Sequence, residues 1–152
     1  MSELTFTDFS LPATGNQTFT LSGARGKHLV IYFYPKDNTP GCTTEAQQFR
    51  DLYGHFTKAQ CEVVGISRDT LKSHENFKAK FTLPFALLAD VDETACNLFG
   101  VIKQKNMYGK KVRGIERSTF VFDQHGQLRH EWRGFKVDGH VQEVLDFVTT
   151  LN

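Results

Sequence analysis

Residues 28–45 read HLVIYFYPKDNTPGCTTE. The first part, residues 28–34, is a continuous β-branched and aromatic run, which predicts a strand buried on both faces, and Pro35 ends it. Thr39 suits a helix N-cap and Pro40 suits the first helical position. Apolar residues then recur at helical spacing, at Ala46, Phe49, Leu52, Tyr53 and Phe56. Cys42 is therefore expected in the first turn of a helix.

Strand and helix patterns alternate through the rest of the chain. Further strands are expected at 63–67, 118–123 and 127–133, and helices at about 71–81 (capped by Asp69), at 92–99 and from residue 138 onward. Before the central run, a Gly15-Asn16 turn between residues 4–7 and 19–21 predicts an N-terminal β-hairpin extension. A basic loop is expected at 103–114. This order predicts one α/β domain over residues 1–152, a thioredoxin-like three-layer fold with a mixed central sheet flanked by helices.

Composition narrows the class of protein. The chain has 152 residues, 39% hydrophobic and 23% charged, which fits one globular domain. A formal net charge of +1 gives no support for a nucleic-acid partner. No apolar run reaches membrane-spanning length, and the N-terminus lacks the pattern of a secretory signal. A cytoplasmic protein without a membrane partner is expected.

The cysteines point to thiol chemistry. There are three, Cys42, Cys61 and Cys96, without the number or spacing of a disulfide framework or a zinc site. A thiolate is the reactive form of cysteine, and a free thiol is mostly protonated at neutral pH. The amides and dipole of a helix N-terminus stabilise the anion, and Cys42 is expected to have that placement. A hydroxyl one turn earlier, on Thr39, can donate a hydrogen bond to a substrate.

These residues carry a family resemblance. The stretch from Pro35 to Cys42 resembles the peroxiredoxin signature P-x-x-x-T-x-x-C, and with residues 43–45 it is similar to the bacterioferritin-comigratory protein or PrxQ subgroup. The similarity continues in order through residues 73–77, 83–85, 87–90, 108–110 and 117–123. It therefore covers nearly the whole chain.

The resemblance implies an activity and a site. It implies a thiol-dependent peroxidase that reduces hydrogen peroxide and organic hydroperoxides, with Cys42 as the nucleophile that becomes a sulfenic acid. Thr39 resembles the hydroxyl partner, Pro35 the residue that shields the thiolate, and Arg117 the guanidinium that reaches the sulfur and the peroxide. No metal, flavin, haem or other cofactor is implied. A thiol, supplied by thioredoxin, glutaredoxin or glutathione, would restore Cys42.

One part of the subgroup pattern is absent. Many members carry a resolving cysteine five residues after the peroxidatic one, where this chain has Gln47, or on the next helix, which here has no cysteine. Cys61 and Cys96 are expected to be inert and buried. The sequence therefore predicts a one-cysteine cycle, and the subgroup resemblance predicts a monomer.

Other interpretations stay open. A thiol–disulfide oxidoreductase on the same fold would want C-x-x-C, and Glu45 stands in that second position. Glu45 is expected to be an exposed charge of the first helical turn. A thioredoxin-like binding or holdase module, in which Cys42 is incidental, is the non-enzymatic alternative. The basic segment 103–114 is expected to be a solvated loop, or else a rim that attracts anionic peroxides or docks a reductase.

Overall fold

A seven-stranded mixed sheet forms the centre of the molecule, which the computed structural model describes over residues 7–152, except for the side chains of Lys105 and Met107. The sheet order is β2-β1-β5-β4-β3-β8-β9, and β6 pairs with β7 in a separate hairpin. The strands are β1 Ser10–Ala13, β2 Gln17–Thr20, β3 His28–Phe33, β4 Cys61–Ser67, β5 Ala86–Ala89, β6 Ile102–Met107, β7 Lys110–Ile115, β8 Ser118–Phe122 and β9 Leu128–Arg133. The helices are the short 3-10 helix η1 Leu21–Ala24, α1 Pro40–Lys58, α2 Leu71–Phe81, α3 Thr94–Phe99 and α4 His140–Thr149.

Strand β3 lies inside the sheet, between β4 and β8, and its run of β-branched and aromatic residues suits burial on both faces. All six are buried. It pairs in parallel with β4 and antiparallel with β8, which makes the sheet mixed. The predicted strand at 28–34 is confirmed, and so is the thioredoxin-like α/β class.

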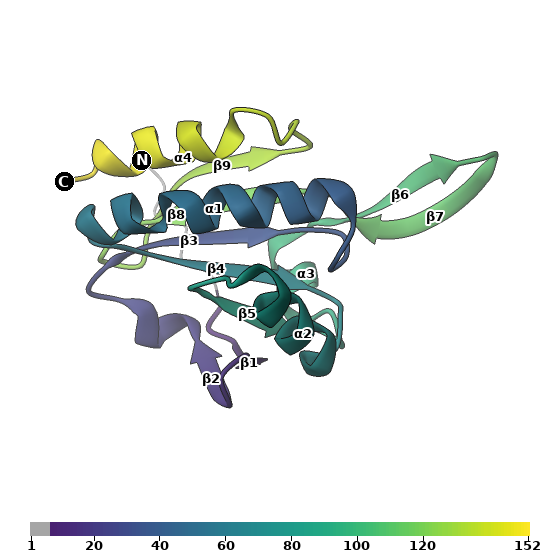
Figure 1. Cartoon of the computed structure of the whole chain (residues 1–152), viewed down its shortest axis with the longest axis horizontal. Helices are drawn as coiled ribbons and strands as arrows, with labels where there is room; N and C mark the ends of the chain where they lie inside the picture. Colours follow the sequence, from purple (N-terminus) through teal and green to yellow (C-terminus); the bar gives the residue numbers. More distant parts are fainter. Residues whose placement is uncertain (1–6) are drawn as a thin grey trace.

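Two apolar clusters lie on opposite faces of the sheet, because successive strand residues point to opposite sides. Val30, Tyr32 and Tyr34 pack with α1, α4 and Phe77 of α2. Leu29, Ile31 and Phe33 face the other way and pack with α3 and the N-terminal hairpin. Figure 1 shows α1 and α4 side by side over the sheet, while α2 and α3 lie nearer the β5 side.

Three local predictions need correction. The N-terminal hairpin is present around Gly15 and Asn16, which both have positive φ, but its first strand is Ser10–Ala13 rather than 4–7; residues 4–6 lie outside the described part. Segment 103–114 is the β6–β7 hairpin and not a loop, because its backbone groups pair with one another in register. The N-cap of α2 is Thr70, whose hydroxyl accepts from the Ser73 amide, and not Asp69.

The carboxyl end of β3 positions the site. There the chain turns through residues 34–39 and enters α1, at the right of Figure 1. Ser118 of β8 is the partner of Phe33, so Arg117, one residue earlier, lies at the same end of the sheet. Within residues 7–152, no helix combines the length and the apolarity needed to cross a bilayer.

Candidate active site

Cys42 is the third residue of α1, and its side chain is buried. Thr39 is the N-cap and Pro40 follows at the first helical position, as the sequence predicts. The Thr43 amide donates to the Thr39 carbonyl at 2.8 Å, which closes the first turn. The sulfur therefore lies beside the amides of the first helical turn, where the helix dipole favours an anion.

Arg117 directly precedes β8, and its side chain reaches the start of α1. Its Nη2 donates to Cys42 Sγ at 3.5 Å, and its Nη1 donates to Glu45 Oε1 at 2.6 Å. Gly41 makes room for this approach, because a Cβ at that position would lie 3.2 Å from Nη2. One guanidinium thus serves two acidic groups on successive turns of α1.

Glu45 was predicted to be exposed, and that prediction is wrong. Its side chain is fully buried, and Oε2 has no hydrogen-bond partner among the described residues. Burial raises the pKa of Glu45 to about 7, although the charge and hydrogen bond of Arg117 act in the opposite direction. The signal was in the helical spacing: Glu45 is three residues after Cys42 and four before Phe49, on the apolar face of α1.

Thr39 and Pro35 border the site along the chain. The Thr39 hydroxyl donates its only proton to the Lys36 carbonyl at 2.9 Å, so its lone pairs remain to accept from a ligand, whereas the sequence had suggested donation. Pro35 lies two residues after the end of β3 and is half-buried. It has no amide hydrogen, so it acts on its surroundings by packing alone.

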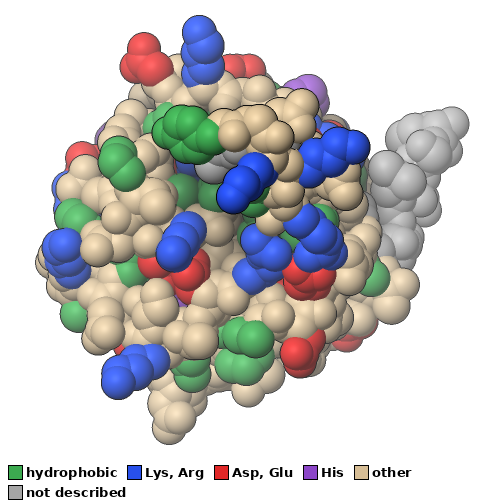
Figure 2. Space-filling view, turned by 90° about the vertical axis from the view of Figure 1, so that its right-hand side faces the viewer, with side chains coloured by type: hydrophobic (Ala, Val, Ile, Leu, Met, Phe, Trp, Pro, Cys, Tyr) green, Lys and Arg blue, Asp and Glu red, His purple; other side chains and the backbone are tan. Residues whose placement is uncertain are grey.

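The surface around this helix start is basic. Figure 2 shows Lys and Arg side chains gathered on the face at which α1 begins. Lys80 donates to Asn38 Oδ1 at 3.2 Å, and Lys36 is exposed in the loop itself. An open hollow of about 400 Å³ lies between this loop and α2, and Lys72 and Lys80 line it with Asn38.

One group of side chains has the residue types of a metal site. Ligand atoms of Asp37, Asp69 and His74 lie within 4.8 Å of one another. Both nitrogens of His74 already have protein partners, Asp37 and the Leu88 carbonyl. A cation would have to break these bonds, so the donor set fits a hydrogen-bonded network better than a metal centre.

The two other cysteines lie apart from Arg117. Cys61 begins β4 opposite His28, at the far end of the sheet from Phe33. Cys96 lies on α3, in the cluster on the other face of the sheet. Burial raises the pKa of Cys61 to about 12, and burial together with a hydrogen bond to Asp90 raises the pKa of Cys96. Both thiols are therefore held in the protonated, unreactive form.

Comparison with known proteins gives the family. Residues 4–131 match the AhpC/TSA family. The chain is 53% identical to Peroxiredoxin Bcp of Xanthomonas campestris over 146 residues, which cover 94% of this chain and 91% of the relative. It is 46% identical to Peroxiredoxin Bcp of Bacillus subtilis over 138 residues, covering 91% and 88%.

Solved structures agree with this placement. A PrxQ variant of Xylella fastidiosa superposes with a TM-score of 0.90 at 39% identity, covering 99% of this chain and 98% of that one. The bacterioferritin-comigratory protein of Xanthomonas campestris, studied for alkyl peroxide reduction, superposes with a TM-score of 0.89 at 49% identity, covering 93% and 90%. The chain therefore belongs to the AhpC/TSA family and, within it, to the Bcp/PrxQ peroxiredoxins, which are thiol-dependent peroxidases.

Proposed function

We propose that Cys42 is the peroxidatic nucleophile of this peroxidase and that Arg117 is its principal electrostatic partner. The observation that carries the proposal is the 3.5 Å hydrogen bond from Arg117 to a sulfur in the first turn of α1. The helix start and the guanidinium act on the same atom, and both favour the thiolate. Arg117 keeps its charge throughout the reaction, because the Glu45 and Cys42 side chains raise its pKa despite burial.

The oxidation step is a displacement at oxygen. The Cys42 thiolate attacks the terminal oxygen of a hydroperoxide, an S–O bond forms and the O–O bond breaks. Sulfur is oxidised by two electrons to the sulfenic acid, and the alkoxide or hydroxide that leaves takes a proton to become alcohol or water. Arg117 faces the oxygen on which negative charge develops, and Thr39 accepts a hydrogen bond from the hydroperoxide O–H.

Replacing the nucleophile tests this assignment. Cys42→Ser is expected to abolish peroxide consumption, and Cys61→Ala, a matched change of a second buried cysteine, is expected to retain it. Retained activity in Cys42→Ser would instead favour the binding or holdase module. An insulin-reduction assay tests the remaining alternative, a thiol–disulfide oxidoreductase. Glu45 stands where C-x-x-C would have its second cysteine and is buried against Arg117, which counts against that alternative.

We further propose a one-cysteine cycle. Cys42 follows the end of β3 and Cys61 is opposite its start, so about 17 Å of strand separates the two ends, whereas a disulfide needs Cα atoms within about 7 Å. Cys96 lies across the sheet. Intact mass measured after one equivalent of peroxide is expected to rise by one oxygen. A loss of two hydrogens, mapped to Cys42 and a second cysteine, would contradict the one-cysteine cycle.

The reductant is then an external thiol. The first thiol attacks the sulfenic acid, releases water and forms a mixed disulfide; a second thiol displaces Cys42 and leaves as the reductant disulfide. We propose thioredoxin, glutaredoxin or glutathione as the source of these thiols. Turnover measured against the concentration of each purified reductant separates them, because the reductant with the largest second-order rate constant recycles Cys42 fastest at a given concentration.

A further inference from the structure

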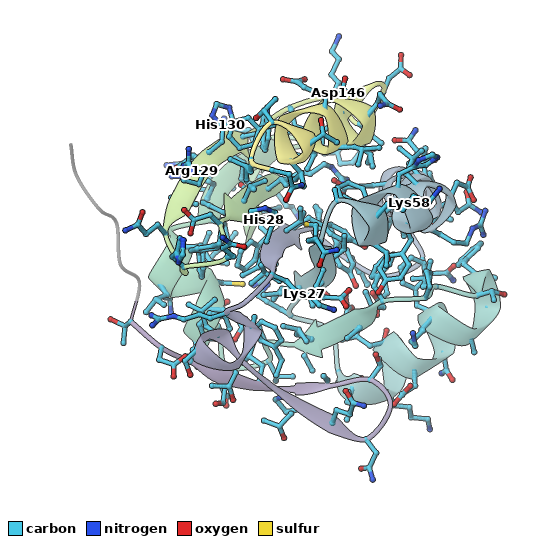
Figure 3. All side chains as sticks on the ribbon, turned by 90° about the vertical axis from the view of Figure 1, so that its left-hand side faces the viewer. Lys27, His28, Lys58, Arg129, His130 and Asp146 are labelled. Atoms are coloured by element: carbon cyan, nitrogen blue, oxygen red, sulfur yellow. The ribbon has the colours of Figure 1, made fainter. Side chains whose placement is uncertain are left out.

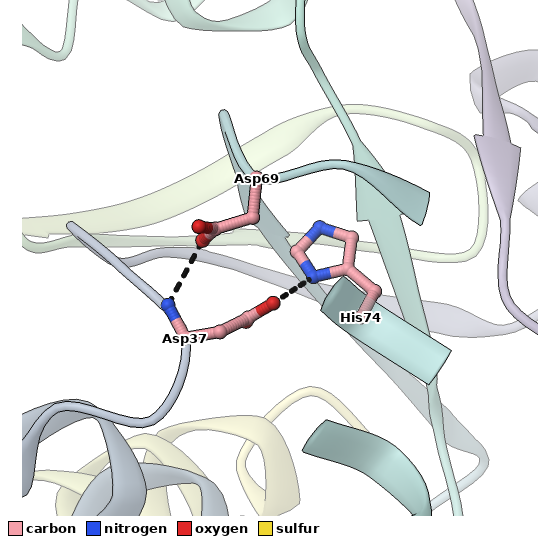
Figure 4. Close-up of side chains that lie close together, drawn as sticks. All are labelled: Asp37, Asp69 and His74. Carbon is pink, nitrogen blue, oxygen red and sulfur yellow. Dashed lines mark hydrogen bonds and ion pairs between the residues drawn. The ribbon is translucent and has the colours of Figure 1, made fainter. Parts of the chain in front are cut away.

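A buried histidine ties the loop before Cys42 to the body of the protein. His74 lies on α2 and is fully buried, and its Nδ1 is 2.7 Å from Oδ2 of Asp37. Asp37 belongs to the turn between β3 and Thr39. Figure 4 shows the imidazole pointing at the Asp37 carboxylate, with the Asp69 carboxylate beside the Asp37 amide.

The hydrogen bonds of His74 fix its protons. Nε2 lies 2.8 Å from the carbonyl oxygen of Leu88 on β5. A carbonyl only accepts, so Nε2 carries a hydrogen. A neutral ring would then present a lone pair at Nδ1, facing a carboxylate oxygen. A proton must therefore lie between Nδ1 and Asp37.

The hydrogen bonds that Asp37 accepts favour this proton on the histidine. Tyr34 donates its hydroxyl to Oδ1 at 2.5 Å, and Ser73 donates to Oδ2 at 2.8 Å. Burial disfavours the Asp37 carboxylate, but the hydrogen bonds and charge of His74, with Tyr34 and Ser73, outweigh it and lower the pKa of Asp37. Asp69 adds a second carboxylate nearby. These hydrogen bonds are those expected of a buried imidazolium–carboxylate pair.

The pair fixes a loop with an unfavourable conformation. Asn38, between Asp37 and Thr39, has φ of +63°, in the left-handed region. Asp69 Oδ2 accepts the Asp37 amide at 2.9 Å, and Lys80 donates to Asn38 Oδ1. The hydrogen bond between His74 Nε2 and the Leu88 carbonyl also ties this loop to β5. A buried ion pair adds little net stability, so the expected contribution of this pair is to the geometry of the turn.

We propose that His74, paired with Asp37, is a positioning residue of the peroxidase reaction: it holds the turn 35–39 so that Thr39 meets the hydroperoxide beside Cys42. This inference rests on the proposed function of Cys42 and Thr39. It assigns to α2, which contributes no cysteine in this chain, the task of shaping the peroxide pocket.

The test compares two electrophiles on the same sulfur. A hydroperoxide needs Thr39 in place, whereas iodoacetamide needs only the Cys42 thiolate. His74→Gln and Asp37→Asn are expected to lower the rate constant with hydrogen peroxide roughly tenfold to a hundredfold, in line with the cost of a misplaced reacting group, and to leave alkylation little changed. The matched control is His28→Gln, a second buried histidine, at the start of β3 and labelled on the side of the molecule shown in Figure 3, which is opposite to the side shown in Figure 2. The control is expected to change neither rate.

Three results would overturn the inference. One is an unchanged peroxide rate in both variants; another is an equal fall in both reactions, which means general loss of structure. The third is a wild-type nitrogen spectrum that shows His74 protonated on only one ring nitrogen, a measurement that needs no variant to fold.

The double variant Asp37→Asn/His74→Gln gives a further test. Its peroxide rate constant is expected to fall by less than the product of the two single-variant falls, because no buried charge is left unpaired. If the wild-type protein consumes peroxide and Cys42→Ser does not, the proposed function stands. A failure of the tests above then concerns the role of His74 alone.

Discussion

Arg117 and Cys42 meet at 3.5 Å although 75 positions separate them in the chain. The contact follows from the pairing of β8 with β3, which brings residue 117 to the sheet end where α1 begins. The same guanidinium is bound to Glu45, one turn further along α1. Separate nitrogens of one guanidinium therefore hold the sulfur and the carboxylate.

Arg117→Met is expected to lower the peroxide rate constant about a hundredfold to a thousandfold, as for loss of a preorganised donor to developing charge. Arg117→Lys is expected to recover only part of it, since an ammonium lacks the fork that serves Cys42 and Glu45 together. Stopped-flow peroxide reduction measures both. Arg129→Lys, at a half-exposed arginine paired with Asp123, is the control and should match wild type. Equal rates for Arg117→Met and wild type would exclude the electrostatic role.

The sequence predicts the framework of this site because the relevant signals are local. The apolar run of β3, the Thr39-Pro40 helix start and the placement of Cys42 depend on neighbouring residues and are confirmed. Strand β5 was not predicted, since its four residues are too short for a periodic signal. The roles of Pro35 and Thr39 stay predictions. The Arg117 contact needed the family resemblance, because no local pattern encodes the register of β8 on β3.

The burial of Glu45 was the main failure of sequence reasoning. Glu45 and His74 both lie on the apolar faces of their helices, but a carboxylate at such a position is normally assigned to solvent. What stabilises each is a partner distant in sequence: Arg117 for Glu45, and Asp37 with the Leu88 carbonyl for His74. The periodicity of apolar residues shows which face of a helix is buried. It does not show which distant residue pairs with a charge on that face.

Glu45→Gln should change how stability depends on pH. Burial raises the pKa of Glu45 from its ordinary 4.5 to about 7, so between those values the folded protein holds the proton that the unfolded chain has lost. The free energy of unfolding contributed by Glu45 therefore falls as pH rises through this window. Urea unfolding at a series of pH values measures it, and the variant is expected to lack this downward contribution.

His140 changes the free energy of unfolding with pH in the opposite direction to Glu45, which makes the effect of Glu45→Gln easier to detect. Burial lowers the pKa of His140 from 6.5 to about 4, so the unfolded chain binds more protons between those values and stability rises with pH. In wild type the two slopes oppose each other between about pH 4.5 and 6.5. Glu45→Gln is expected to show a net rise over that window. A pH profile parallel to wild type would mean that Glu45 is already ionised throughout.

Alkylation should distinguish the three cysteines in the native protein. With the pKa of Cys61 near 12, about one molecule in ten thousand has that thiolate at pH 8, and burial also raises the pKa of Cys96. Iodoacetamide at pH 8 is expected to label Cys42 first and the other two only after unfolding in urea. Peptide mapping at increasing times gives the order. Native labelling of Cys61 or Cys96 as fast as Cys42 would contradict this account of their inertness.

Two glycines should respond to alanine with opposite signs. Gly65 of β4 lies between its register partners Tyr32 and Leu87, and an added Cβ would meet the Tyr32 ring at 2.8 Å and Leu87 Cδ2 at 3.0 Å. Tyr32 cannot retreat freely, because it stacks on Phe49 of α1 with centroids 4.5 Å apart. Gly65→Ala is therefore expected to cost about 1–3 kcal/mol of unfolding free energy, as overpacking of a core does.

Gly54, exposed in the interior of α1, has no atom within 4 Å of the added Cβ. Gly54→Ala is expected to gain about 0.5–1 kcal/mol, because alanine restricts the unfolded chain and favours the helix. Urea unfolding of both variants at one pH gives the two free energies. A destabilised Gly54→Ala would mean that α1 needs the freedom of glycine there. An unchanged Gly65→Ala would mean that the stack of Tyr32 on Phe49 can shift to admit a methyl group.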